Sequence, residues 1–503
     1  MADAPDVIGV VGAGTMGAGI AQLAAAAGAR TLLHDPVPEA LERGLSRIDD
    51  GLERWRTKGR LEREPGPVSG AAELGELAEA GLVIEAAPER LELKRELFAA
   101  LADIAPRAVL ASNTSSIPIT AIAGALADPG RVVGMHFFNP PPVMGLLEVI
   151  AGIDSSPEAL DVARATGRAM GKRVIDATDG PGFLVNRCNR PFGLEALKLL
   201  QERAADVATI DAIVRSAGFR MGPFELQDLV GIDVGYEVSL SFHELSFGEP
   251  RWRPSPLSAR MVAAGRLGRK TGRGWYEYPR EQAEEPEAPA PGGGGGRIVV
   301  VAGELNVAEE LRALAANAGF DARSQDDAGG DVPWLLVDCG ADPDGPPLQG
   351  GPVALLCADG SLQSLDGGGA AVGFHVLPPL DSAALVELTR GDGTADVAAE
   401  RAEAFFAALG KRTAWVGDGP GLVLGRIACQ LVNEACFAVS EGVGTREDVD
   451  DGMVLGLNHP RGPFAWCEAI GVAHVLAVLD GLRIELGEER YRAAPLLRRL
   501  AIP

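Results

Sequence analysis

The chain has 503 residues, of which 47% are apolar and 23% are charged, and its formal net charge is −24 at pH 7. This length predicts about three domains of roughly 150 residues each. The negative charge argues against nucleic acid and anionic membrane surfaces as partners, because both would be repelled. A polyanionic ligand would therefore have to meet a local basic patch.

The cysteines indicate a reducing compartment, because they form no CxxC pair and show no disulfide-framework spacing. They are Cys188, Cys339, Cys357, Cys429, Cys436 and Cys467. The N-terminal letters MADAPDV contain neither the basic nor the apolar part of a signal peptide, and no apolar run reaches the ~18 residues of a membrane span. We expect a soluble cytoplasmic protein without a metal site.

The first 150 residues alternate short apolar runs with helical patterns, and residues 1–178 are predicted to form the first domain. Strands are predicted at residues 7–11, 31–34, 82–86, 108–112 and 131–137. Residues 38–63 carry apolar side chains at helical spacing among many polar and arginine residues, which predicts a protruding helical insertion. Strands that alternate with helices indicate a doubly wound parallel sheet of the Rossmann type.

The next two segments differ from this pattern. Residues 179–280 are predicted to form an all-α domain, which begins at the sequence Asp179-Gly-Pro-Gly182. Residues 281–296 hold acidic residues, prolines and five consecutive glycines. Such a composition cannot bury a core and predicts a flexible linker.

After the linker the chain repeats itself in weakened form. The sequence around His375 resembles that around His136, and Glu387 follows His375 by the same twelve residues that separate Glu148 from His136. A second Asp-Gly-Pro-Gly sequence ends at Gly421, 239 residues after the first. Several matches at one offset predict a tandem duplication, with a degenerate Rossmann-like domain at 297–411 and a second helical domain at 412–503.

The pattern Gly12-x-Gly14-x-x-Gly17 follows the first predicted strand and opens the first helix. Such glycines allow a tight turn, a close backbone approach to a pyrophosphate and close helix–strand packing. Asp35, at the end of the second strand, fits the acid that binds both ribose hydroxyls and would repel a 2′-phosphate. NAD is therefore predicted rather than NADP, and the predicted binding set includes Gly12, Gly14, Thr15, Met16, Gly17 and Asp35.

His136 ends an apolar strand just before a turn of prolines, and Glu148 lies in the next apolar strand. The carboxyl end of a strand is where open α/β sheets bind ligands. An imidazole oriented by a carboxylate can take the proton of an alcohol while hydride leaves the same carbon for a nicotinamide. The two residues therefore predict an alcohol-to-ketone oxidation. Residues 111–116 end another strand at the same edge, where their hydroxyls either bind a substrate oxygen or cap a loop.

Seven motifs in order resemble those of L-3-hydroxyacyl-CoA dehydrogenases over residues 6–280. They are GAGTMGAGIAQ, APERLELKRELF, SNTSS, HFFNPPPVMGLLEVI, PGFLVNR, MGPFELQDLVG and GRLGRKTGRGWY. The tandem arrangement and the ending GEERYRAAPLLR resemble the long bacterial form of this family. That form is associated with oxidation of 3-hydroxyadipyl-CoA in phenylacetate breakdown and of 3-hydroxybutyryl-CoA.

The resemblance implies roles for individual residues. His136 matches the catalytic base, Glu148 its partner, and Ser115 the serine that contacts the substrate hydroxyl. Asn139 and Asn186 match residues that line the active site. Contacts with NAD are implied for Glu89, Lys94 and Asn113, and contacts with the phosphates of CoA for Arg54, Lys58 and Arg60 of the insertion.

The second copy departs from the family pattern where the chemistry lies. Glu304 is expected where a glycine and a phosphate should be, and Pro378 and Gly425 replace the two active-site asparagines. Because a carboxylate repels a pyrophosphate, this half is predicted to bind no NAD. Helical domains of this family commonly pair across a dimer, so the second helical domain is predicted to imitate that partner within one chain.

Two alternatives stay open. A dehydrogenase of a free hydroxy acid or sugar acid would have the same cofactor half, although the arginine-rich insertion favours acyl-CoA. A non-catalytic module that binds NAD or acyl-CoA is expected to lose the set Ser115, His136, Glu148 and Asn186, which the first copy keeps. A hydratase–dehydrogenase is disfavoured because no segment remains for a hydratase domain. The sequence does not fix the acyl chain length.

Overall fold

The structure is a computed structural model that describes residues 3–281 and 286–502. It divides into two compact units. The first unit comprises Met1–Arg187 with Glu441–Leu457, and the second comprises Cys188–Ser440 with Asn458–Pro503. Among the described residues, no helix combines the length and apolar character that a membrane span needs. All six cysteines are buried.

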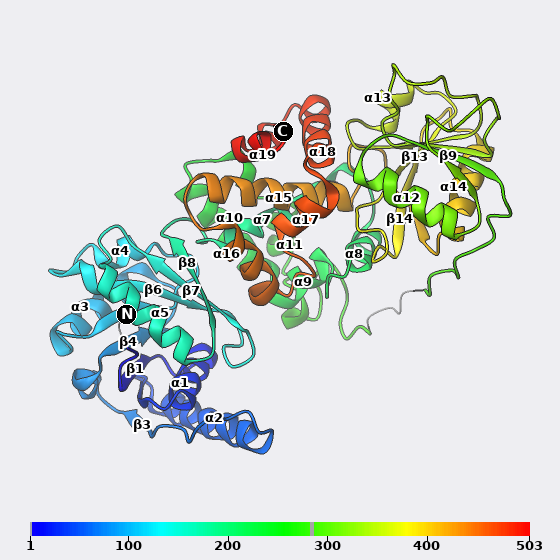
Figure 1. Cartoon of the computed structure of the whole chain (residues 1–503). Coiled ribbons are helices and arrows are strands. Elements are labelled where there is room, and N and C mark those ends of the chain that lie inside the picture. The colour runs from blue at the N-terminus through cyan, green and yellow to red at the C-terminus, as the bar shows by residue number, and fades with distance from the viewer. Residues whose placement is uncertain (1–2, 282–285, 503) are drawn as a thin grey trace. The chain divides into compact units, whose positions relative to one another are not determined.

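The first unit is built on an eight-stranded sheet in the order β3-β2-β1-β4-β5-β6-β7-β8 (Figure 1). Its strands are β1 (Val7–Val11), β2 (Arg30–His34), β3 (Val68–Ala71), β4 (Leu82–Glu85), β5 (Val109–Ser112), β6 (Val132–Phe137), β7 (Leu146–Ala151) and β8 (Arg173–Thr178). The Rossmann-type sheet is confirmed, with one departure from the predicted parallel arrangement, since β6 and β7 pair antiparallel. A short proline turn joins them, and a turn of this kind can only reverse the chain.

Helices pack around this sheet. They are α1 (Thr15–Ala26), α2 (Pro38–Thr57), α3 (Leu91–Ile104), α4 (Ile119–Ala123) and α5 (Pro157–Ala169), and the short helix α6 (Val185–Cys188) follows β8 along the chain. Apolar side chains of α1, α2 and α5 share one hydrophobic cluster with the strands. The insertion is shorter than predicted: α2 ends at Thr57, and Gly59 follows with a φ of 65°. A left-handed glycine is a common way to end a helix.

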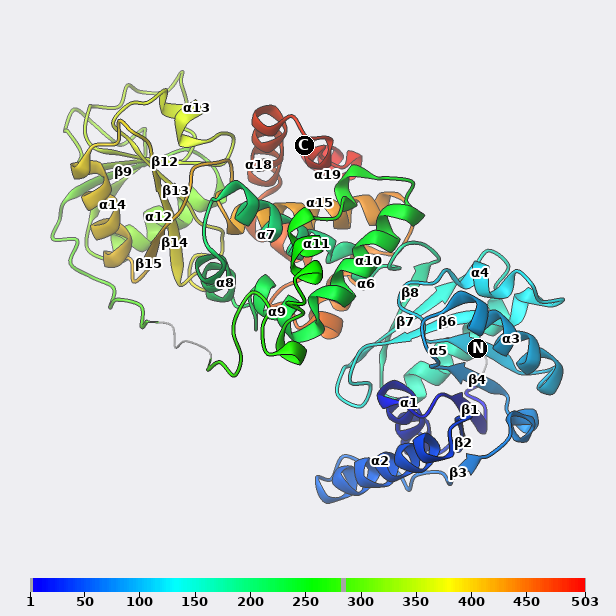
Figure 2. The ribbon, with the colours of Figure 1, turned by 180° about the vertical axis from the view of Figure 1, so that it is seen from behind.

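The second unit contains a seven-stranded sheet in the order β10-β9-β11-β12-β13-β14-β15 (Figure 2). Its strands are β9 (Ile298–Ala302), β10 (Asp321–Arg323), β11 (Leu335–Asp338), β12 (Val353–Leu356), β13 (Val372–His375), β14 (Leu385–Arg390) and β15 (Arg412–Trp415). Helices α12 (Asn306–Asn317), α13 (Leu362–Asp366) and α14 (Asp396–Ala408) accompany it. The order repeats that of the first sheet without β3, and β13 and β14 form the matching antiparallel pair.

The predicted flexible linker is wrong for residues 292–296. The N–H groups of Gly292, Gly294 and Gly296 donate to carbonyls of Ala408, Ala318 and Gly319 at 2.8–2.9 Å. A Cβ at Gly294 would lie 2.3 Å from the carbonyl carbon of Gly319, so this approach requires glycine. Residues 282–285 of the predicted linker lie outside the described residues.

The rest of the second unit is helical, which agrees with the prediction of an all-α domain at residues 179–280. Its main helices are α7 (Arg190–Glu202), α8 (Val207–Ser216), α9 (Pro223–Val230), α10 (Ile232–Leu245), α11 (Pro256–Ala263), α15 (Leu424–Ser440), α17 (Pro463–Ile470), α18 (Val472–Leu486) and α19 (Pro495–Leu500). Helix α7 packs against α15 at the centre of this unit. Pro191 lacks an N–H and separates α6 from α7, whereas α15 is continuous.

Candidate active site

The turn between β1 and α1 forms a cradle that side chains would fill. Gly12 has a φ of 101°, and a Cβ there would lie 2.6 Å from the carbonyl oxygen of Ala86. A Cβ at Gly17 would lie 1.7 Å from the carbonyl oxygen of Gly12, whereas a Cβ at Gly14 would meet no atom within 4 Å. Helix α1 begins at Thr15 and no side chain caps it. The first-turn N–H groups of Thr15, Met16 and Gly17 are thus of the kind that helix N-termini offer to phosphate groups.

Asp35 follows β2 and is fixed beside this cradle. One carboxylate oxygen accepts a hydrogen bond from the Ala13 N–H at 2.8 Å, and the other accepts one from the Val37 N–H at 3.0 Å. The carboxylate is thus oriented before any ligand binds, which suits an acceptor for ribose hydroxyls.

The carboxyl ends of β4 and β5 hold a buried charged network. The ammonium of Lys94 lies 2.6 Å from Glu85 and 3.3 Å from Glu89. Burial acts to raise the pKa of Glu89, but Lys94 and the hydrogen bonds from Thr114, Ser116 and Ser115 outweigh it, so this pKa lies below its ordinary value. Sequence reasoning missed Glu85, although a carboxylate at the end of the buried strand Leu82–Glu85 was a visible signal.

His136 and Glu148 are cross-strand partners in the antiparallel pair β6–β7. The imidazole Nδ1 lies 2.6 Å from Oε2 of Glu148, whose side chain is fully buried. Oε1 of Glu148 accepts hydrogen bonds from the N–H groups of Val185 at 2.9 Å and Leu184 at 3.2 Å. Because a carboxylate only accepts, Nδ1 donates in this contact, and in the neutral ring Nε2 is then the acceptor.

The other predicted residues surround this pair at different depths. Asn113 accepts a hydrogen bond from the Phe137 N–H at 2.8 Å, which ties β5 to β6 beside His136. Asn186 lies half-buried on α6, directly after the N–H groups that bind Glu148. Ser115 and Asn139 are exposed. Arg54, Lys58 and Arg60 are exposed at the end of α2, where Arg56, which sequence reasoning did not select, pairs with Glu53 and Glu64.

The matching position in the second sheet has different chemistry. His375 is fully buried, and its Nε2 lies 3.1 Å from Nε2 of His474. Among the described residues its Nδ1 has no hydrogen-bond partner. The oxygens of Glu387 instead accept from the N–H groups of Val423 and Leu424. A Cβ at Gly425 would lie 2.1 Å from the His375 ring, so no longer side chain fits there.

The nucleotide cradle is also changed in the second sheet. Gly303, with a φ of 104°, occupies the position of Gly12 after the strand, and Leu305 precedes the helix as Gly14 does. Glu304 thus corresponds to Ala13, so its predicted placement at a glycine position is wrong by one residue. A cavity of about 760 Å³ lies at this edge, and acidic side chains such as Glu304, Asp326, Asp342 and Asp359 contribute to its lining.

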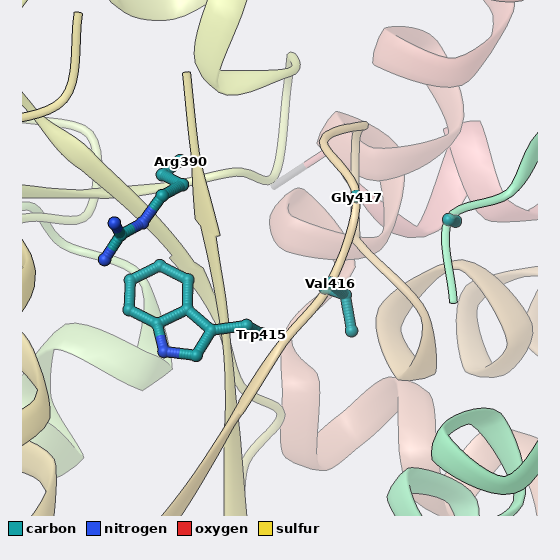
Figure 3. Close-up of a pocket in the computed structure, with 5 residues that line it drawn as sticks. Arg390, Trp415, Val416 and Gly417 are labelled. Atoms are coloured by element: carbon teal, nitrogen blue, oxygen red, sulfur yellow. The ribbon is translucent and has the colours of Figure 1, made fainter. Parts of the chain in front are cut away.

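A separate hollow of about 470 Å³ in the second unit is shown in Figure 3. Ala204, Arg390, Trp415, Val416 and Gly417 line it. The Arg390 guanidinium lies 4.3 Å from the centre of the Trp415 ring. The predicted site residues do not line this hollow, so it is not the candidate active site.

A nucleotide cradle, an oriented acid and a histidine–carboxylate pair on one sheet edge define an NAD-dependent dehydrogenase. The family comparison identifies its kind. The model of the 3-hydroxyacyl-CoA dehydrogenase NAD binding domain matches residues 7–180, and the model of the C-terminal domain matches residues 182–278 and again residues 421–502. The chain belongs to the 3-hydroxyacyl-CoA dehydrogenase family and is an NAD-dependent enzyme of that kind.

Individual relatives agree with this assignment. The chain is 35% identical over 502 residues to the 3-hydroxyadipyl-CoA dehydrogenase of Escherichia coli K12, covering 98% of this chain and 97% of that protein. A crystal structure of 3-hydroxybutyryl-CoA dehydrogenase from E. coli K12 matches with a TM-score of 0.83 at 33% identity, covering 100% of this chain and 98% of the other. A probable 3-hydroxybutyryl-CoA dehydrogenase of Deinococcus radiodurans is 41% identical, but its match covers 54% of this chain and 99% of that protein.

Proposed function

We propose that the chain oxidises the hydroxyl of an (S)-3-hydroxyacyl-CoA at the edge of the first sheet, with His136 as general base. The observation that carries this proposal is the 2.6 Å contact of His136 with the buried Glu148, in the same unit as the glycine cradle. A neutral imidazole with its Nδ1 proton held by a carboxylate presents Nε2 to a substrate hydroxyl.

In this mechanism Nε2 of His136 takes the proton of the C3 hydroxyl, and the O–H electron pair becomes part of the new C=O bond. NAD, when bound, accepts the hydride that leaves C3 with the C–H electron pair. Glu148 keeps the ring oriented and stabilises the imidazolium that forms. Its two hydrogen bonds from Leu184 and Val185 keep it in place during this step.

Other residues bind and position the reactants. Ser115 and Asn186 are proposed to bind the oxygen atoms of the substrate, and Asn139 to line the same site. The proposed NAD contacts are Gly12, Gly14, Thr15, Met16, Gly17, Asp35, Glu89, Lys94 and Asn113. The buried Lys94 is already paired with two carboxylates, so it acts best by holding Glu89 in place. Arg54, Lys58 and Arg60 are proposed phosphate contacts for CoA.

The substrate is proposed to be 3-hydroxyadipyl-CoA or 3-hydroxybutyryl-CoA, because the relatives named above act on these esters according to their names. NADH formation measured with 3-hydroxybutyryl-, 3-hydroxyhexanoyl- and 3-hydroxyadipyl-CoA tests this directly. We expect turnover of at least one ester and none of the matching free acids. Faster turnover of a free hydroxy acid would favour the first alternative, and NAD binding without any turnover would favour the non-catalytic module.

We further propose that the second half is a duplicated copy that serves as a built-in dimer partner and binds no NAD. Each half supplies the arginine of one ion pair and the glutamate of another, and the two pairs are related by an offset of 239 residues. Arg187 pairs with Glu441 at 2.7 Å and Arg426 with Glu202 at 2.6 Å. Likewise Arg251 pairs with Glu434 at 2.9 Å, and Arg490 lies 3.6 Å from Glu195. Exchanged contacts of this kind are the signature of a two-fold interface.

A further inference from the structure

The first unit contains a segment from far along the chain. Residues Glu441–Leu457 leave the helical part of the second half and belong to the compact unit of the first sheet. The segment consists of a loop, helix α16 (Arg446–Asp451) and the π-helical turn η5 (Gly452–Gly456), and η5 packs against β7. Figure 1 labels α16 within this segment.

Charges fix the outer end of the segment. The guanidinium of Arg173 on β8 lies 2.6 Å from Asp451, 3.1 Å from Glu447 and 3.6 Å from Asp448. The loop before α16 is also held, because the Thr178 N–H donates to the carbonyl of Val443 at 3.1 Å. The segment is therefore attached along the length of β8.

Its glycines bring the backbone against the residues that hold Glu148. A Cβ at Gly444 would lie 2.6 Å from Leu184, and one at Gly452 would lie 2.6 Å from Val185. Leu184 and Val185 are the residues whose N–H groups hold Glu148. The segment thus packs directly behind the carboxylate that orients the catalytic imidazole.

The turn η5 reaches the substrate side of the site. A Cβ at Gly456 would lie 2.7 Å from Leu146 and 3.3 Å from the ring of Phe138. The Phe138 ring in turn lies 4.7 Å, centre to centre, from the ring of His136. The ring of Phe138 therefore lies between the turn and the imidazole of His136. The remaining side chains of the turn are apolar: Met453 is buried, and Val454 and Leu455 are exposed.

We propose that residues 452–457, supplied by the second half, form an aliphatic wall of the acyl site in the first half and set which acyl chains it accepts. The proposal rests on the proposed function of His136. The absence of a side chain at Gly456 leaves room for Phe138, and with it for the part of the acyl chain beyond C3. The second half then contributes to catalysis by shaping the site of the first half.

The corresponding contact, between the end of α8 in the first half and the second sheet, supports the same arrangement. Ser216, the last residue of α8, and the following Ala217 line a cavity of only about 20 Å³ with Leu377, Leu385 and neighbours of the second sheet. By the offset of 240 that relates Gly462 to Gly222, Ser216 corresponds to Gly456. Ser216 thus has a side chain where Gly456 has none, and the cavity beside Ser216 is too small for an acyl chain.

The test compares Gly456→Val with Ser216→Val in the full chain. Specificity constants, kcat/KM, are measured for 3-hydroxybutyryl-, 3-hydroxyhexanoyl- and 3-hydroxyadipyl-CoA, together with the Kd of NAD. We expect Gly456→Val to lower kcat/KM for the longer esters at least about fivefold more than for the shortest. The Kd of NAD should stay within about twofold, and Ser216→Val should leave the ratios unchanged. If Gly456→Val lowered kcat/KM equally for all esters, or left it unchanged, the proposal that residues 452–457 form a wall of the acyl site would be wrong.

A charge exchange keeps the test valid if Gly456→Val does not fold. Arg173→Glu should raise KM for the CoA esters several-fold, by releasing the segment, without weakening NAD binding. Adding Asp451→Arg should restore KM toward the wild-type value. Failure of this rescue, or a parallel loss of NAD affinity, contradicts the proposal. Wild-type turnover and the loss caused by His136→Gln, measured alongside, show separately whether the proposed function itself holds.

Discussion

The two sheets contain the same histidine–glutamate register but differ in what these residues contact. In the first sheet His136 bonds to Glu148 at 2.6 Å, whereas His375 turns to His474 and makes no hydrogen bond to Glu387. Burial raises the pKa of Glu387 to about 8, and no imidazole compensates it. Sequence spacing alone therefore does not make a general base.

Features shared by both halves belong to the scaffold. Lys172 donates to the carbonyls of Pro141 and Met144, and Lys411 donates to that of Leu380 in the matching turn. Asp179 and Asp418 accept N–H groups at the start of α4 and α13 in the same way. Features found in the first half alone, such as the open position of Gly14 and the side chain of Asn186, belong to the site that we propose for the reaction.

Substitution of the two histidines should show the largest difference between the two halves. His136→Gln removes the proton acceptor and is expected to lower kcat by about 10²- to 10⁴-fold, with NAD binding retained. His375→Gln, the matched control, should leave kcat within about twofold, because its ring is sealed away from substrate. Steady-state kinetics with a CoA ester and fluorescence titration of NAD measure both effects. Near-normal activity of His136→Gln would refute the assigned base.

The asparagine position gives the next effect. Asn186→Gly copies the second half and should lower kcat by about 10²-fold, because a positioned hydrogen-bonding group is lost. The reverse change, Gly425→Asn, places a side chain into the His375 ring and should lower the stability of the second unit by about 1–3 kcal/mol without changing kcat. Kinetics and urea unfolding separate the two outcomes. If Gly425→Asn impaired catalysis as much as Asn186→Gly, the proposed division of labour would be wrong.

The buried histidines of the second half predict a smaller, pH-dependent effect. Burial lowers the pKa of His474 to about 4, below its ordinary value of 6.5. The unfolded chain takes up this proton first as the pH falls, so its contribution to stability is complete above pH 6.5 and is lost toward pH 4. The slope is up to about 1.4 kcal/mol per pH unit for one histidine.

Urea midpoints measured between pH 7 and pH 5 check this expectation. The slope of the unfolding free energy with pH gives the number of protons taken up on unfolding. His474→Leu should lower this number by close to one, whatever its effect on stability at pH 7. An unchanged dependence would mean that His474 does not stay neutral in the folded protein.

Local signals predicted the structure of the first half well. The strands near residues 7–11 and 131–137, the glycine turn and the twelve-residue spacing of His136 and Glu148 correspond to observed structure. Non-local pairing was harder to predict. The edge strand Val68–Ala71 is short and partly polar, and its pairing with β2 depends on residues far along the chain.

Other features could not be read from local sequence for the same reason. Lys94 looks like an ordinary charge on a helix, and its burial depends on Glu85 from another element. The glycines at 292–296 resemble a linker, but they bond to the second sheet domain. The placement of Glu441–Leu457 with the first sheet follows from packing between distant segments, for which the sequence offers no periodic signal.

The number of NAD molecules bound per chain tests most directly the claim that only one half is reactive. Calorimetric titration of the wild type should give one site, and Gly14→Leu, which copies Leu305, should remove it. Leu305→Gly should add no second site, because the acidic side chains at that edge remain. Two sites in the wild type, or one site that persists in Gly14→Leu, would contradict the claim that NAD binds to the first half alone.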